Sequence, residues 1–191
     1  MKYIPNTLTF IRIILTPFCI YFLLFDSKPI LAFSLFIIAS ITDGFDGYYA
    51  RKFNVISRLG AFLDPLADKI MVVSMFLCFF YLYDNIVNIY VLSMIIFRDV
   101  FVTFIRMIME YRNYTLVTSK ISKLKTVFQI VAINVMFIAI IFGGEIFLND
   151  QSLYLLILML ITAIITFYTG IHYFVTNYKQ LKLICNFNVK G

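Results

Sequence analysis

Apolar residues fill most of the chain in long runs, and short polar or charged segments separate these runs. Each run approaches the roughly 20 residues that a helix needs to cross a bilayer. Hydrophobic residues make up 62% of the 191 positions, which is more than a soluble domain of this size can bury. The pattern therefore predicts an all-α, polytopic integral membrane protein, a single domain over residues 1–191, with six transmembrane helices near 7–25, 30–50, 60–82, 86–110, 126–144 and 153–175.

Charged residues are distributed unevenly between the connections. The termini and every second connection are basic, with Lys2, Arg51, Lys52, Arg58, Arg112, Lys120, Lys123, Lys125, Lys179, Lys182 and Lys190. The remaining connections hold one basic residue, Lys28. Their other charged residues are acidic, namely Asp26, Asp84, Glu145 and Asp150. The positive-inside rule then predicts that both termini are cytoplasmic. The net charge of +6 fits this asymmetry and contact with anionic lipids better than it fits binding to nucleic acid.

Two pairs of aspartates interrupt the second and third apolar runs. In a helix, residues at i, i+4 and i+8 share one face. That spacing holds for Asp43, Gly47 and Arg51 on one run, and for Gly60, Asp64 and Asp68 on the next. A short basic connection joins the two runs, so we expect antiparallel neighbours whose carboxylates face one another near the cytoplasmic end.

Carboxylates in apolar surroundings are costly unless a metal, a cation or water compensates them. Carboxylate oxygens suit Mg²⁺ or Mn²⁺, and this set could hold two ions. Arg51 can bind phosphate through two donors, which favours phosphoryl chemistry with one carboxylate as a base. Two other interpretations stay open: ion pairing of the aspartates with Lys or Arg, and an ion-coupled transport pathway. Against transport, the carboxylates cluster at one end and no inverted repeat is evident.

The segments Asp43-Gly-Phe-Asp46-Gly47-Tyr-Tyr-Ala-Arg51 and, eight residues later, Gly60-Ala-Phe-Leu-Asp64-Pro-Leu-Ala-Asp68 resemble the signature of the CDP-alcohol phosphotransferase family. The resemblance implies transfer of a phosphatidyl group from CDP-diacylglycerol to an alcohol, with release of CMP. It also implies the residue roles. Asp43, Asp46 and Asp64 would hold the metal ions, Asp68 would serve as metal ligand or general base, Gly47 and Gly60 would border the nucleotide, and Arg51 would contact its phosphates.

Three further segments resemble the bacterial branch of this family that uses glycerol 3-phosphate as acceptor. The resemblance also implies a homodimer in the membrane, because members of the family usually form homodimers. In the first segment, Asn6 and Thr9 could bind the nucleotide; alternatively, Asn6 caps a helix and Arg12 reaches toward the interface. In the second, Arg98-Asp99 stands where that branch has Arg-Glu, and Arg106 follows. Arg98 is interpreted as pairing with a carboxylate, and Arg106 as a phosphate ligand.

The third segment, Ser119 to Thr126, contains a Lys-x-Lys-Thr order. Lys123, Lys125 and Thr126 could bind the acceptor's phosphate, or the lysines could simply flank the fifth span on its cytoplasmic side. A phosphorylated acceptor needs cations that a neutral alcohol does not, so the cluster favours glycerol 3-phosphate. Other acceptors, namely phosphatidylglycerol, serine and inositol phosphate, remain alternatives.

The cysteines and the aromatic residues carry less information about function. Cys19, Cys78 and Cys185 show no metal or redox spacing and are expected to be packing residues. The 22 Phe and 13 Tyr are expected to form lipid-facing surface and belts at the membrane interface.

Overall fold

The computed structural model describes the backbone of residues 4–53, 58–111, 120–143 and 152–187, and the side chains of residues 11–42, 69–109, 124–143, 152–178 and 180–182. Every secondary-structure element in these ranges is a helix, which confirms the prediction of an all-α protein. The elements are α1 (Ile4–Leu24), α2 (Pro29–Phe53), α3 (Arg58–Leu82), α4 (Ile89–Tyr111), α5 (Lys120–Ile138) with the π-helical turn η1 (Ala139–Gly143), and α7 (Ser152–Phe187).

The helices follow the predicted apolar runs, but several ends differ, and α5 begins at Lys120 instead of near residue 126. Helix α4 begins at Ile89, later than expected, because the Asn88 Oδ1 atom accepts a hydrogen bond of 3.0 Å from the Val91 amide and caps the helix. Helix α7 continues to Phe187, well past the predicted end at residue 175. An apolar run marks only the part suited to lipid, whereas the helix itself continues because no Gly or Pro interrupts residues 176–187.

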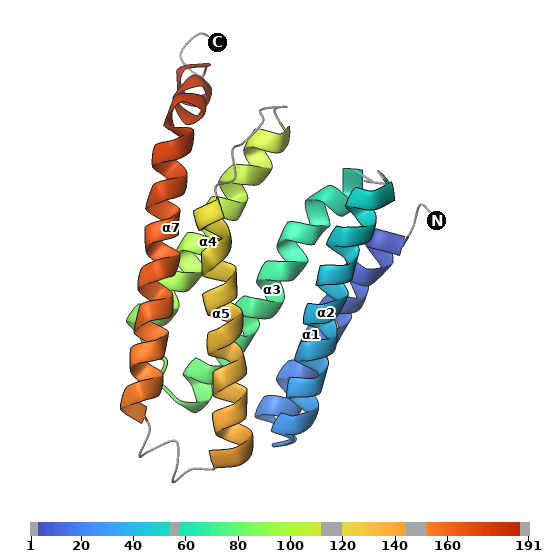
Figure 1. Cartoon of the computed structure of the whole chain (residues 1–191), viewed down its shortest axis with the longest axis vertical. Coiled ribbons are helices and arrows are strands. Elements are labelled where there is room, and N and C mark those ends of the chain that lie inside the picture. Colours follow the sequence, from blue (N-terminus) through green and yellow to red (C-terminus); the bar gives the residue numbers. More distant parts are fainter. Residues whose placement is uncertain (1–3, 54–57, 112–119, 144–151, 188–191) are drawn as a thin grey trace.

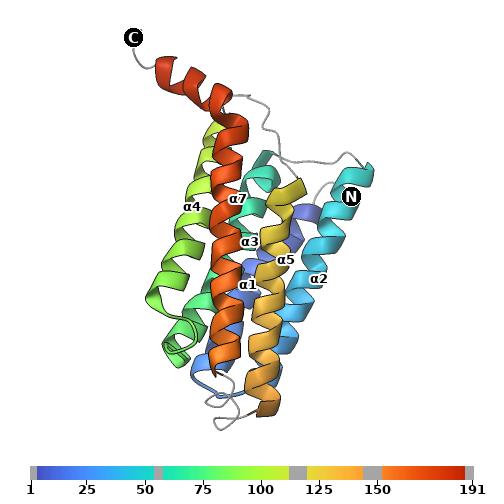
Figure 2. The same cartoon turned by 60° about the vertical axis from the view of Figure 1, so that its left-hand side comes forward.

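The helices run up and down in one bundle (Figures 1 and 2). The first turn of α1 and the last turn of α7 lie at the same end of the bundle as the C-terminal ends of α2 and α4. Consecutive helices therefore alternate in direction along the bundle. Within the bundle, α1 packs against α2 and α3, α7 packs against α4 and α5, and α3 contacts both α4 and α5.

Buried aromatic rings join three of the helices. The Phe137 ring on α5 lies 5.2 Å from that of Phe33, 5.8 Å from that of Phe36 and 5.4 Å from that of Phe79, measured between centroids. Phe36, Phe76, Phe79 and Phe137 are at most 1% exposed. The expectation that the aromatic residues face lipid or the interface is therefore wrong for these four, because large rings also fill the space between helices.

Small and sulfur-containing side chains let α1 and α2 approach closely. The Cys19 thiol of α1 donates to the carbonyl of Ala32 in α2 at 2.9 Å, and both residues are fully buried. Cys78 is 3% exposed and, like Cys19, is a free cysteine. The prediction that Cys19 and Cys78 are packing residues is confirmed, whereas Cys185 lies outside the described side chains.

Two helical stretches in the described part are long and apolar enough to cross a membrane, judged by length and composition. They are Leu124–Gly143 and Ser152–Tyr178. Shorter apolar stretches occupy Ile11–Leu24, Pro29–Thr42 and Lys69–Leu82. Large apolar side chains such as Phe97, Ile164 and Val175 are more than half exposed, as expected for helices that face lipid rather than water.

Candidate active site

The aspartate motif lies in the C-terminal part of one helix and the N-terminal part of the next helix in the chain. Asp43, Asp46, Gly47 and Arg51 belong to α2, and Gly60, Asp64 and Asp68 belong to α3. Their backbone is helical, so the shared faces expected from the i, i+4, i+8 spacing apply. The side chains of residues 43–68 lie outside the described ones, as do those of Asn6, Thr9 and Lys123. Where side chains are described, no three His, Cys, Asp or Glu residues gather as a metal site.

Lys69, the first described residue after this motif, belongs to a set of polar side chains that converge on one carboxylate, that of Asp99 in α4. Asp99 is fully buried, with 0% of its surface exposed. Its Oδ1 atom accepts hydrogen bonds from Arg98 Nη1 at 3.0 Å and from Lys125 Nζ. Its Oδ2 atom accepts a hydrogen bond from Gln129 Nε2 at 3.0 Å, and Lys69 Nζ lies 4.0 Å from the same oxygen.

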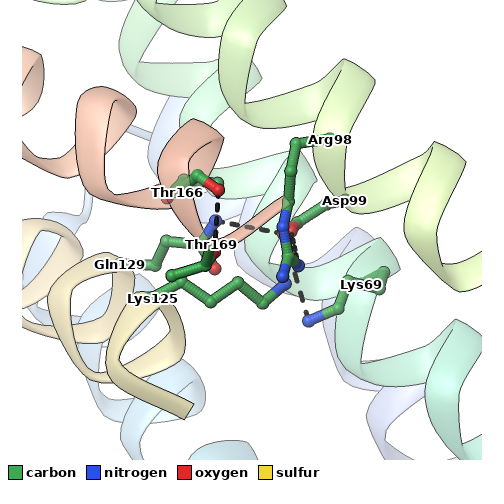
Figure 3. A network of polar contacts seen from close by, with 7 residues as sticks. All are labelled: Lys69, Arg98, Asp99, Lys125, Gln129, Thr166 and Thr169. Carbon is green, nitrogen blue, oxygen red and sulfur yellow. Dashed lines mark hydrogen bonds and ion pairs between the residues drawn. The ribbon is translucent and has the colours of Figure 1, made fainter. Parts of the chain in front are cut away.

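We call this set of residues (Lys69, Arg98, Asp99, Lys125 and Gln129) the Asp99 network; Figure 3 shows how its side chains converge. Three helices contribute to it, namely α3, α4 and α5. Among these residues three cations face one carboxylate. Buried charges are tolerated when they are paired and hydrogen-bonded, and an excess of buried cations in such a set favours an anionic ligand.

Arg98 is held against α7 by a glycine. A Cβ atom at Gly170 would lie 2.8 Å from Arg98 Cγ, which is closer than real Cβ contacts permit, so only glycine leaves room for the arginine there. The Arg98 side chain is 5% exposed and forms the ion pair with Asp99 described above. The interpretation that Arg98 pairs with a carboxylate is therefore confirmed.

The other predicted acceptor residues with described side chains differ in their burial. Lys125 is only 5% exposed and belongs to the Asp99 network, whereas its neighbour Thr126 is half-buried. Arg106 lies two turns beyond Arg98 on α4 and is exposed. At a rise of about 1.5 Å per residue, it is roughly 12 Å further along the helix axis. The structure thus brings Lys125, but not Arg106, into direct contact with Asp99.

The face of α7 beside the network is polar although it is buried. Thr162 and Thr169 donate to the carbonyls of Leu158 and Thr166 within their own helix. Thr166 Oγ1 and Gln129 Oε1 are buried without a hydrogen-bond partner among the described residues, and Figure 3 shows Thr166 and Thr169 next to the network. Such threonines lower the cost of placing charged groups between apolar helices.

Lys69 and Gln129 are members of the network that sequence reasoning missed. Each carried a signal in the sequence. Lys69 directly follows Asp68, and Gln129 stands four residues after Lys125, on the same helical face. Lys69 also lines an apolar groove of about 260 Å³ between α3 and α4, so this side chain lies between the network and the outer surface of the bundle.

Comparisons with known proteins agree on one family. The family profile described as CDP-alcohol phosphatidyltransferase matches residues 2–175. Three bacterial relatives share the name CDP-diacylglycerol--glycerol-3-phosphate 3-phosphatidyltransferase. The Rickettsia typhi protein is 35% identical over 178 residues, which cover 91% of this chain and 96% of that protein. The Wigglesworthia glossinidia protein is 42% identical over 135 residues (68% and 74%). The Cereibacter sphaeroides protein is 39% identical over 139 residues, covering 71% of this chain but less than two thirds, 63%, of that protein.

Proposed function

The chain belongs to the CDP-alcohol phosphatidyltransferase family, and we propose that it transfers the phosphatidyl group of CDP-diacylglycerol to glycerol 3-phosphate, giving phosphatidylglycerophosphate and CMP. The match to the Rickettsia typhi protein carries this proposal, because it spans nearly the whole of both chains and that relative is named for this reaction. The buried cations around Asp99 give independent support, since a phosphorylated acceptor needs positive charge at its site.

The aspartate motif is the proposed metal site. Asp43, Asp46, Asp64 and Asp68 supply only hard oxygen donors, and this donor set fits Mg²⁺ or Mn²⁺ and could be shared by two ions. Bound there, the ions would neutralise charge on the phosphate oxygens and on the departing CMP. Arg51 would contact the phosphates of the nucleotide through its planar donors.

Nucleotide binding is assigned to residues on the same stripes and on α1. Gly47 and Gly60 lack side chains and so let the cytidine nucleotide approach the helix backbone. Asn6 and Thr9 would donate or accept hydrogen bonds at its edge. These assignments rest on the motif and on the family.

Asp68 is the proposed general base. An alcohol hydroxyl is a weak nucleophile at neutral pH, so a positioned carboxylate must accept its proton. The acceptor oxygen then forms a bond to the phosphorus that carries the diacylglycerol, and the bond between that phosphorus and the CMP oxygen breaks. The proton ends on Asp68, and CMP leaves with the bonding electrons.

The phosphate of glycerol 3-phosphate would be bound by Arg106, Lys123, Lys125 and Thr126. Lysine and arginine donate charge-assisted hydrogen bonds to phosphate, and these are roughly twice as strong as neutral ones. The burial of Lys125 beside Asp99 means that its ammonium group is already withdrawn from water. A cation in that state attracts a phosphate more strongly than one on an open surface does.

We further propose that all six apolar helices cross the cytoplasmic membrane of a bacterium, with both termini and the site on the cytoplasmic side. The basic residues in every second connection support this orientation. The acyl chains of CDP-diacylglycerol would reach the site from within the bilayer. The active form is proposed to be a homodimer, as is usual in the family.

An acceptor screen tests the proposed reaction. Purified protein in detergent would receive labelled CDP-diacylglycerol with Mg²⁺ and one candidate at a time: glycerol 3-phosphate, phosphatidylglycerol, serine or inositol phosphate. We expect CMP release and labelled phosphatidylglycerophosphate with glycerol 3-phosphate alone. Preferential product formation with another alcohol would overturn the acceptor assignment. No membrane gradient is present in detergent, so CMP release there would come from an enzyme and not from ion-coupled transport. No CMP release with any acceptor would therefore overturn the enzymatic function.

A further inference from the structure

Asp99 holds amino groups from two other helices. Lys125 of α5 and Lys69 of α3 reach opposite oxygens of its carboxylate, Oδ1 and Oδ2. Arg98 already supplies one counter-charge from the neighbouring position in the chain. A carboxylate needed only to neutralise Arg98 would not require two further cations. The arrangement therefore calls for a role of the lysine pair itself.

We propose that Asp99 is a positioning residue for acceptor binding, which holds the ammonium groups of Lys69 and Lys125 together so that both can bind the phosphate of glycerol 3-phosphate. This inference rests on the proposed function. It adds Lys69 to the acceptor site and gives Asp99 a role through the two lysines.

Charge balance within the network supports the proposal. Lys69, Arg98 and Lys125 are three basic side chains beside the single carboxylate of Asp99, so basic groups outnumber acidic ones within the network. A phosphate monoester carries about −1.5 to −2 charges at neutral pH, as phosphorylated side chains do. A group of this charge is attracted to such a set of donors.

The geometry also suits two flexible donors. Each lysine has a four-carbon stem and three ammonium donors, so an unheld side chain would sample many positions. The Lys125 ammonium is hydrogen-bonded to Asp99, and Gln129 Nε2 fixes the carboxylate from the next turn of α5 at 3.0 Å. Lys69 lies at 4.0 Å, an electrostatic contact rather than a hydrogen bond. Its side chain is 15% exposed, compared with 7% for Lys125.

Lys69 also connects the two halves of the proposed site. It directly follows Asp68, the proposed base, on α3, whereas Lys125 belongs to the acceptor segment of α5. A carboxylate that holds both lysines therefore couples the helix that carries the base to the helix that binds the acceptor. This coupling would set the position of the acceptor's reacting hydroxyl relative to the proposed base.

The test compares full-length purified variants in detergent with both substrates. Asp99→Asn should raise the KM for glycerol 3-phosphate by about tenfold or more, while the KM for CDP-diacylglycerol changes by less than about twofold. Asp99→Glu, which keeps the charge, should recover most of the acceptor affinity. Lys69→Gln should also raise the KM for glycerol 3-phosphate, as Asp99→Asn does. Met136→Leu, a buried change in the apolar core of α5 outside the network, is the control and should leave both KM values unchanged.

A double variant separates positioning from a structural role. If Asp99 acts through the lysines, adding Asp99→Asn to Lys125→Gln should raise the acceptor KM by much less than Asp99→Asn does alone, because part of the effect is already lost. The double variant removes one negative and one positive charge, so it can still test the proposal if Asp99→Asn alone does not fold. Fully multiplicative effects on KM, or a lower unfolding temperature with both KM values unchanged, would show a purely structural role and overturn the proposal. Failure of the wild type to use glycerol 3-phosphate would instead overturn the proposed function.

Discussion

The ammonium group of Lys125 on α5 contacts the carboxylate of Asp99 on α4, and both side chains are withdrawn from the surface of the protein. The two residues are far apart in the chain, and the ion pair ties the proposed acceptor segment to the centre of the bundle. A lysine held in this way is oriented before the substrate arrives. This preorganisation lowers the cost of binding a phosphate.

Lys125→Ala should therefore act mainly on the acceptor. Removing one charge-assisted phosphate contact should raise the KM for glycerol 3-phosphate by about tenfold or more, with little change in the KM for CDP-diacylglycerol. Steady-state kinetics with each substrate varied in turn would measure this. Lys28→Ala is the matched control, because Lys28 pairs with Asp26 in the α1–α2 connection, at the opposite end of the bundle. An unchanged acceptor KM together with poor membrane insertion would identify Lys125 as a topological flank.

Metal removal should abolish activity. The four aspartates of the motif offer only oxygen ligands, so chelation should stop CMP release, and Mg²⁺ or Mn²⁺ should restore it. Asp43→Asn, Asp46→Asn and Asp64→Asn should each lower turnover by about 100-fold or more, since a metal supplies several kcal/mol of charge stabilisation. Asp84→Asn, at an exposed aspartate of the α3–α4 connection, should have no effect. Full turnover after exhaustive chelation would rule out the metal site.

Asp68 should differ from the other three aspartates. Asp68→Asn keeps the shape of the side chain but removes the proton acceptor, so turnover should fall by about 10²–10⁴-fold. Metal-dependent binding of CDP-diacylglycerol should persist, and titration of the purified variant with nucleotide would measure it. Loss of binding in parallel with turnover would make Asp68 primarily a metal ligand. Survival of turnover would exclude both roles.

Gly170→Ala should destabilise the bundle. The added methyl group would meet Arg98 Cγ at 2.8 Å and force the arginine away from Asp99. Overpacking of this kind costs about 1–3 kcal/mol, which corresponds to a fall of roughly 2–12 °C in the unfolding temperature of a chain of this size. Thermal unfolding in detergent, followed by circular dichroism, would measure the shift. Thr176→Ala is the control, because its hydroxyl contacts His172 on the exposed side of the same helix. An equal midpoint for both variants would mean that Arg98 can move at no cost.

The sequence alone determined the helices and the family, and it supplied the proposed chemistry of the motif. These features are local, since an apolar run or an i, i+4, i+8 spacing can be read without knowing what the helix contacts. Asp43, Asp46, Asp64 and Asp68 were identified in this way as a proposed site. The pairing of Arg98 was also within reach, because its partner Asp99 is the next residue in the chain.

Only the tertiary structure decided which distant side chains meet. Lys69, Asp99, Lys125 and Gln129 come from three helices, and no spacing within one helix predicts their convergence. The burial of Phe137 at the centre of a ring cluster was missed for the same reason. In an apolar chain nearly every helix face is hydrophobic, so composition cannot distinguish the face that packs against other helices from the face that lies in lipid.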